Sequence, residues 1–177
     1  EAEMVNMNDL KKYIRSIPDF PKKGILFRDI TTLIGNKDKF KEVIDTLAKK
    51  YADKKIDAVL AVESRGFIFG GALAYKLGAG FVPVRKKGKL PSKTIQATYS
   101  LEYGEDTLEI HEDAIKPGAR VLLIDDLLAT GGTLGAVIDL VKKLKGEIVE
   151  IAFIIELEDL KGRSKLSDFP VYSMIQY

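Results

Sequence analysis

Residues 121–133 read Val-Leu-Leu-Ile-Asp-Asp-Leu-Leu-Ala-Thr-Gly-Gly-Thr, and this stretch decides the fold class. An apolar run over residues 120–125 ends in two adjacent carboxylates, which is typical of a strand buried on both faces of a parallel sheet. A loop of small residues follows, and the apolar spacing over residues 131–145 predicts a helix that ends at Gly146. In such a sheet, ligands bind at the carboxyl ends of the strands. We therefore expect a binding site where the carboxylates meet the loop.

The rest of the chain alternates between buried strands and helices. Short apolar runs predict strands over residues 57–62, 81–84 and 149–155, and helical spacing predicts helices over residues 9–17, 37–52 and 66–77. This alternation predicts an α/β fold, an open and mostly parallel sheet flanked by helices on both faces. The length of 177 residues favours one domain over residues 1–177. We expect residues 157–177 to add an edge strand or to pack against the sheet.

A charged insert interrupts this alternation. Residues 85–93 hold five basic side chains with Gly88 and Pro91. Residues 94–103 and 107–111 then alternate around a Tyr-Gly-Glu-Asp turn, which predicts a hairpin of half-exposed antiparallel strands. We expect the insert to be a small antiparallel hood rather than core, with hood elements around residues 20–35 and 85–115.

Composition excludes several classes of protein. The formal net charge is +2, from 28 basic and 26 acidic side chains, which favours no nucleic-acid partner. The absence of cysteine excludes a disulfide scaffold and a cysteine zinc site, and the single histidine, His111, excludes a histidine metal cluster. No apolar run approaches the roughly 20 residues of a membrane helix. Residues 1–10 do not resemble a signal peptide, so we expect a cytoplasmic protein.

Residues 121–133 have the chemistry of a sugar-phosphate site. Asp125 and Asp126 suit the hydroxyl groups of a sugar. The following loop leaves backbone N–H groups accessible at a helix N-terminus, where a phosphate is favoured. The loop residues are Ala129, Thr130, Gly131, Gly132 and Thr133. An ordinary strand, turn and helix cap is the alternative. Neither a Walker loop nor a Gly-x-Gly-x-x-Gly motif after a strand occurs.

With these residues the sequence resembles the type I phosphoribosyltransferase family. Further motifs resemble the branch of that family that acts on adenine, and the resemblance covers nearly the whole chain. They are Phe-Pro-Lys-Lys-Gly-Ile-Leu-Phe-Arg-Asp-Ile at residues 20–30, Glu-Ser-Arg-Gly-Phe at 63–67, Arg-Lys-Lys-Gly-Lys-Leu-Pro at 85–91 and Tyr-Ser-Leu-Glu-Tyr-Gly at 99–104. The resemblance implies transfer of the 5-phosphoribosyl group from phosphoribosyl diphosphate to adenine, giving AMP and diphosphate in purine salvage. It also implies Mg²⁺, carried by the substrate diphosphate, and a homodimer.

For the diphosphate, the resemblance implies contacts from basic side chains. Arg65 is expected to hold it, because a guanidinium matches phosphate oxygens in a bidentate manner. Arg85, Lys86 and Lys89 match a mobile basic segment that closes over the diphosphate. Read without the resemblance, this charge run is better explained as a solvated surface.

For the base, the resemblance implies contacts from two further segments. Phe27 is expected to stack on adenine, while the backbone near Leu26 and Arg28 reads its hydrogen-bonding edge and rejects other purines. Glu102 is expected to face purine N7 and handle its proton, with Tyr103 beside it in the hood. Without the resemblance, Glu102 would be interpreted as an exposed carboxylate on a strand.

Two other functions stay open at this stage. A phosphoribosyltransferase for hypoxanthine, guanine or xanthine would share most of these motifs. A non-catalytic sensor of phosphoribosyl diphosphate would keep the fold, although we expect too few residues before Phe20 for a DNA-binding domain, and the Glu102 motif favours an enzyme. His111 is assigned no role.

Overall fold

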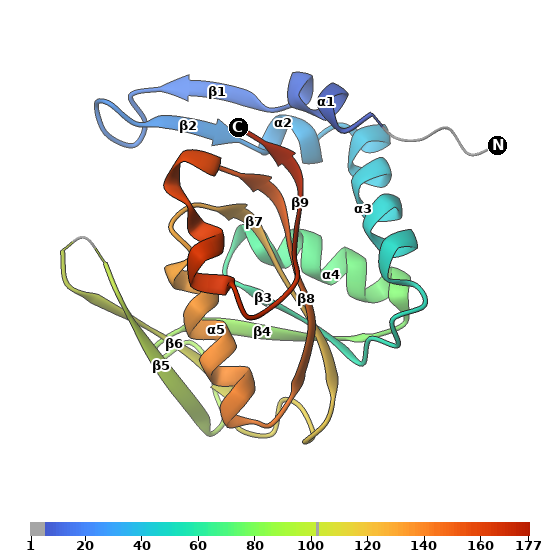
Figure 1. Cartoon of the computed structure of the whole chain (residues 1–177), viewed down its shortest axis with the longest axis vertical. Helices are drawn as coiled ribbons and strands as arrows, with labels where there is room; N and C mark the ends of the chain where they lie inside the picture. Colours follow the sequence, from blue (N-terminus) through green and yellow to red (C-terminus); the bar gives the residue numbers. More distant parts are fainter. Residues whose placement is uncertain (1–5, 102) are drawn as a thin grey trace. The chain divides into compact units, whose positions relative to one another are not determined.

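The structure, a computed structural model, describes residues 6–101 and 103–177 (Figure 1). The described residues form two compact units, which divide between Lys50 and Tyr51. The expectation of one domain with two hood segments stays a prediction. No helix in the described part of the chain is long and apolar enough to cross a membrane.

The first unit is built from short elements and one long helix. Its elements are α1 (Met7–Leu10), the 3-10 helix η1 (Lys11–Tyr13), β1 (Arg15–Pro18), β2 (Leu26–Asp29), α2 (Thr31–Ile34) and α3 (Lys37–Tyr51), which runs one residue into the second unit. The predicted helix over residues 37–52 is confirmed. Strands β1 and β2 form an antiparallel pair in which Arg15 lies opposite Asp29 and Pro18 opposite Leu26.

The helix predicted over residues 9–17 is wrong in its second half. Helical structure ends at Tyr13, and Arg15–Pro18 is a strand. Pro18 disfavours the helical conformation of the residue before it, and pairing with β2 satisfies the extended backbone. Asp29 fixes the end of β2, because it accepts hydrogen bonds from Thr31 N and Oγ1 at 2.9 and 2.6 Å and from Arg15 Nη2 at 2.6 Å. These contacts, Thr31 first, lower the pKa of Asp29 to about 2.

The second unit is a seven-stranded mixed sheet with two long helices. Its elements are β3 (Ala58–Val62), α4 (Arg65–Leu77), β4 (Gly80–Lys86), β5 (Thr94–Ser100), β6 (Glu105–His111), β7 (Arg120–Leu128), α5 (Gly132–Lys143), β8 (Glu147–Glu156), the 3-10 helices η2 (Glu158–Leu160) and η3 (Gly162–Leu166), and β9 (Val171–Gln176). The strand order is β5-β6-β4-β3-β7-β8-β9. Strands β4, β3, β7, β8 and β9 are parallel, whereas β6 is antiparallel to both of its neighbours. The predicted fold class is confirmed.

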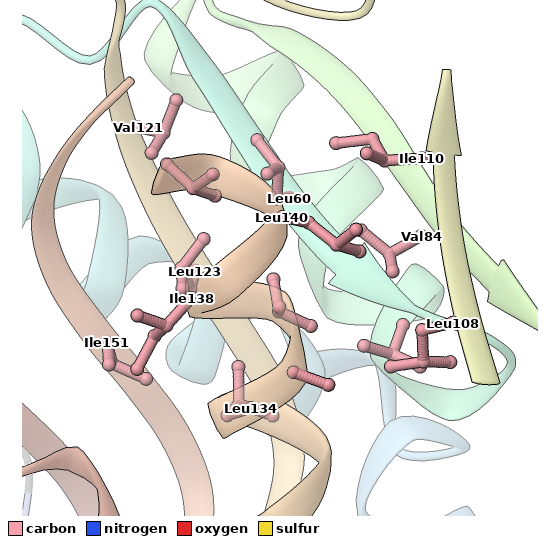
Figure 2. Packing of buried hydrophobic residues seen from close by; sticks show 14 of the residues in the cluster. Leu60, Val84, Leu108, Ile110, Val121, Leu123, Leu134, Ile138, Leu140 and Ile151 are labelled. Carbon is pink, nitrogen blue, oxygen red and sulfur yellow. The ribbon is translucent and has the colours of Figure 1, made fainter. Parts of the chain in front are cut away.

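The two helices cover opposite faces of this sheet. Leu60 and Leu123 belong to a buried cluster with Leu134 and Ile138 of α5 (Figure 2). The adjacent strand residues point to the other face, where Ala61 lies against Gly70 of α4. Both faces of the central strands are therefore buried, which explains why their sequences are continuously apolar.

The hairpin of β5 and β6 forms one edge of the main sheet. Strand β6 pairs with the end of β4, and Ala97, Leu108 and Ile110 are buried in the same core cluster. The predicted antiparallel hairpin is confirmed. Burial alternates along β5 as predicted, whereas in β6 the consecutive residues Leu108, Glu109 and Ile110 are all buried.

The C-terminal segment adds the other edge of the sheet. The expected edge strand is β9, which pairs in parallel with β8. Strand β7 is longer than predicted, because β8 pairs with it beyond the carboxylates, at Leu127 and Leu128.

Candidate active site

The candidate site lies where β3, one of the two strands that pair with β7, ends. Pairing between β3 and β7 stops at Ala61 and Ile124, whereas β8 accompanies β7 as far as Leu128. Asp125 and Asp126 are the next two residues of β7, so they lie at the carboxyl end of β3. This is the edge at which ligands bind in parallel sheets.

Two cavities share the residues at this edge. One, of about 220 Å³, is lined by Arg65, Asp125, Asp126, Leu127, Leu128, Ala129, Thr130, Gly131, Gly132, Thr133, Leu134 and Phe153. The other, of about 400 Å³, is lined by Val62, Glu63, Ser64, Arg65, Lys86, Tyr99, Leu108, Asp125, Asp126 and Thr133. Four residues, Arg65, both aspartates and Thr133, line both cavities, so the cavities adjoin. The structure thus brings together the predicted loop, the carboxylate pair, Arg65 and Lys86.

The loop reaches the start of α5 through a conformation that requires glycine. Gly131 precedes the first residue of α5 and has φ of 87°. A Cβ added there would lie 2.5 Å from the carbonyl oxygen of Gly162. The first N–H groups of a helix have no acceptor within the helix, and at α5 they belong to residues that line the smaller cavity. An anion in that cavity would be favoured by these groups and by the helix dipole.

The carboxylate pair is held by Arg65 and by its own backbone. Arg65 Nε donates to Asp126 Oδ2 at 2.5 Å, and the Asp126 N–H donates to Asp125 Oδ1 at 2.8 Å. Burial, together with the charge of Asp126, raises the pKa of Asp125 well above its ordinary value. Hydroxyl donors or a cation in the cavity would favour the ionised form of Asp125.

A second ion pair places Lys86 at the larger cavity. Lys86 Nζ lies 3.2 Å from Asp106 Oδ2, and this contact raises the pKa of Lys86. Tyr99 donates from its hydroxyl to the same Asp106 oxygen at 3.3 Å. On the strand end opposite, Glu63 Oε1 accepts from the Lys86 N–H at 2.7 Å and from Arg85 Nε at 3.2 Å.

Glu63, Tyr99 and Asp106 were not among the predicted site residues. Tyr99 lies in a motif noted in the sequence, and it is paired with Asp106 across β5 and β6. That register is the signal that would have linked the two residues. Glu63 directly follows β3 in the chain, so its place at the carboxyl edge follows from the same rule that identified the aspartates.

Several predicted residues do not line either cavity. Arg85 is engaged by Glu63, and Lys89 follows β4 in a turn. Tyr103 is 90% exposed. Glu102 lies outside the described residues, so its predicted role is untested.

The predicted base-binding residues Leu26, Phe27 and Arg28 belong to β2 of the first unit. The Phe27 ring meets that of Phe20 edge-on at 5.2 Å, and Arg28 Nη1 donates to Ser16 Oγ at 2.7 Å. Their roles stay predictions. Among the described residues, no group of three or more His, Cys, Asp or Glu side chains gathers where it would hold a metal ion.

Comparison with known proteins gives consistent matches. The family profile described as phosphoribosyl transferase domain matches residues 31–176. An adenine phosphoribosyltransferase of Acidobacterium capsulatum is 59% identical over 173 residues, which cover 98% of this chain and 96% of the relative.

Solved structures agree with this match. The crystal structure of adenine phosphoribosyltransferase from Thermoanaerobacter pseudethanolicus is 50% identical with a TM-score of 0.93, covering 97% of this chain and 100% of that one. The enzyme from Saccharomyces cerevisiae, in complex with an imino-altritol bisphosphate and adenine, is 44% identical with a TM-score of 0.90, covering 95% of this chain and 97% of that one.

Proposed function

The chain belongs to the phosphoribosyltransferase family and, within it, to the adenine phosphoribosyltransferases, and on this premise we propose how its site holds the substrates. The enzyme transfers the 5-phosphoribosyl group of phosphoribosyl diphosphate to adenine, forming AMP and diphosphate in purine salvage. One observation carries the assignment of positions: the loop of residues 129–133 and the pair Asp125 and Asp126 line the same cavity.

The 5′-phosphate binds at the loop and the ribose at the carboxylates. The N–H groups at the start of α5 and the hydroxyls of Thr130 and Thr133 supply donors to phosphate oxygens. Asp125 and Asp126 accept from the 2′- and 3′-hydroxyls of the ribose. Both positions lie within reach of one ribose 5-phosphate because they line one cavity.

The diphosphate binds on the side of Arg65 and Lys86. Both cations face the larger cavity, and each is already paired with a carboxylate, Asp126 or Asp106, so both are positioned before substrate arrives. Arg85, near the end of β4, and Lys89, in the turn after β4, close over the diphosphate. The positive charge of these side chains stabilises the negative charge that develops on the diphosphate as its bond to C1′ breaks.

Asp125 and Asp126 would hold Mg²⁺ only indirectly, with the ion carried by the substrate diphosphate. The donors present fit this role, since Asp125 and Asp126 offer hard oxygen atoms and Mg²⁺ favours substrate phosphates and retained water over an all-protein cage. When bound, the ion supplies charge neutralisation for the departing diphosphate. Asp125 and Asp126 act mainly through the ribose hydroxyls or through bridging water.

Adenine is held by the β2 segment, with Phe27 stacked on the ring and the backbone of Leu26 and Arg28 reading its edge. The N9 atom of adenine bonds to C1′ as the bond from C1′ to the diphosphate oxygen breaks. The base must then lose one proton, and Glu102 accepts it at N7, with Tyr103 beside it. A positioned carboxylate in this role contributes typically about 10²–10⁴-fold.

A homodimer is supported by an apolar strip on α4. Ile68 and Tyr75 are seven residues apart, on one face of the helix, and both are exposed, as is Phe81 at the start of β4. The cytoplasmic location stays a prediction.

The test is a panel of purine bases. Diphosphate release is measured with phosphoribosyl diphosphate, Mg²⁺ and adenine, hypoxanthine, guanine or xanthine in turn. The proposal requires turnover with adenine and far less with the other bases. Turnover with hypoxanthine but not adenine would contradict the substrate assignment, and no turnover with any base, despite binding of phosphoribosyl diphosphate, would favour a sensor.

A further inference from the structure

The segment after β8 lies directly behind the phosphate-binding loop. Gly131 of the loop and Gly162 of η3 approach so closely that neither has space for a side chain. A Cβ on Gly131 would lie 2.5 Å from the Gly162 carbonyl oxygen, and a Cβ on Gly162 would overlap the Ala129 carbonyl oxygen and lie 2.8 Å from Leu128 Cδ1. The backbone position of Gly162 therefore limits where the loop can lie.

Arg163, the next residue, is held in place by several contacts. Its Nε donates to both carboxylate oxygens of Glu156 at 2.9 Å, and its Nη2 donates to Glu156 Oε1 at 2.8 Å. Its Nη1 donates to the Val171 carbonyl at 2.9 Å, and its Nη2 also donates to Ser173 Oγ at 3.1 Å. The side chain thus ties η3 to β8 and β9.

The acceptor at the centre of this network is buried and satisfied. Glu156 is 5% exposed, and the Ser173 hydroxyl donates to its Oε1 at 2.5 Å. The Arg163 guanidinium, with the Ser173 hydroxyl, lowers the pKa of Glu156 below its ordinary value. Only a planar guanidinium can make the paired contact with the carboxylate and still reach Val171 and Ser173. Without Arg163, the buried carboxylate would lose its counter-charge, and η3 would lose its attachment.

We infer that Arg163 is a positioning residue for the phosphoribosyl group, because it fixes Gly162 against the loop that holds the 5′-phosphate. The inference rests on the proposed binding of that phosphate at residues 129–133. Arg163 itself does not line the cavity with that loop. It acts through the backbone of Gly162, whose contact with Gly131 and Ala129 sets the direction of the N–H groups at the start of α5.

Loss of the Arg163 contacts is expected to weaken binding of the 5′-phosphate and not binding of the diphosphate. Arg65 and Lys86, the proposed diphosphate ligands, belong to α4 and β4, and they pair with Asp126 of β7 and Asp106 of β6. Loosening η3 therefore changes the phosphate loop and leaves the cations of the diphosphate side in place. A general loss of folding would weaken both ligands equally.

Arg163→Met tests this, since methionine keeps an unbranched apolar stem and removes the guanidinium. Calorimetric titration with ribose 5-phosphate, well below the unfolding temperature of each protein, should show binding weakened about 10-fold or more, the scale expected when a binding group is displaced. The KM for diphosphate in the reverse reaction, at saturating AMP, should stay within about twofold. Arg120→Met is the matched control, because it breaks the surface pair of Arg120 with Glu147 (2.9 Å) at the start of β7, and it should change neither value.

Arg163→Lys keeps the positive charge, and it tests the positioning role of Arg163 if the methionine variant does not fold. It should give an intermediate loss of ribose 5-phosphate affinity, because an ammonium cannot reproduce the paired contact. Wild-type affinity in the folded variants, or equal weakening of ribose 5-phosphate and diphosphate, would overturn the inference. Failure of the wild-type enzyme to bind ribose 5-phosphate would instead contradict the proposed function of the loop.

Discussion

Replacing Asp125 with asparagine should change stability and activity in opposite directions. The substitution preserves shape, so Oδ1 still accepts from the Asp126 N–H and still fits against Gly66, where a Cβ would lie only 3.0 Å away. It removes one negative charge from a buried pair. We therefore expect the fold to tolerate Asp125→Asn.

Stability should rise because the charge is costly in the folded state. Burial and the neighbouring Asp126 raise the pKa of Asp125 well above the value of about 3.9 that an unfolded aspartate has. The ionised carboxylate therefore destabilises the fold above pH ~4, and this penalty is absent at lower pH, where both states are protonated. Asp125→Asn should raise the free energy of unfolding at pH 7, and the gain should shrink as the pH falls towards 4.

Activity should fall because asparagine is a weaker acceptor for a ribose hydroxyl. A hydrogen bond to a charged group contributes about 1.5–3 kcal/mol, so kcat/KM for phosphoribosyl diphosphate should fall roughly 10- to 150-fold. Urea denaturation at pH 4 and pH 7, with initial rates at varied phosphoribosyl diphosphate and saturating adenine, measures both effects. A variant that is less stable at pH 7 yet fully active would refute the reasoning.

Three further substitutions test separate parts of the account. Gly131→Ala combines a positive φ, which costs about 1–2 kcal/mol, with overlap on the neighbouring backbone, so calorimetry should show more than about 10-fold weaker binding of ribose 5-phosphate. Gly135→Ala, at an open position of α5, is its control and should bind normally. Asp29→Asn should lower the free energy of unfolding by about 1–2 kcal/mol at pH 7, after allowance for solvent screening, and by about half as much at pH 3. The reason is that the Asp29 carboxylate stabilises the fold fully above its unfolded pKa near 4 and loses this effect as the pH falls through its folded pKa of about 2. Equal losses at both pH values would contradict this. Glu102→Gln should slow turnover about 10²–10⁴-fold with little change in phosphoribosyl diphosphate binding, and an unchanged rate in the same assay would remove Glu102 from the mechanism.

The centre of the site could be predicted because its signal is local in the sequence. A buried strand, two carboxylates and a loop of small residues are contiguous from Val121 to Thr133, and the topology rule places them at a ligand-binding edge. Arg65 follows β3, the strand beside β7, so the same rule brings it to that edge. The structure places these residues around one cavity.

Contacts between distant segments could not be predicted from local patterns. Gly162 meets Gly131 only when the last segment folds back behind the loop. The apolar spacing over residues 9–17 predicts a helix up to the residue before Pro18, but residues 15–17 are extended because they pair with β2.

The most direct test of the proposed binding arrangement is a crystal structure of this enzyme with AMP. The account predicts the 5′-phosphate within hydrogen-bond distance of the N–H groups at the start of α5, with the ribose hydroxyls at Asp125 and Asp126. A phosphate bound away from residues 129–133, or a ribose that does not approach either aspartate, would contradict it.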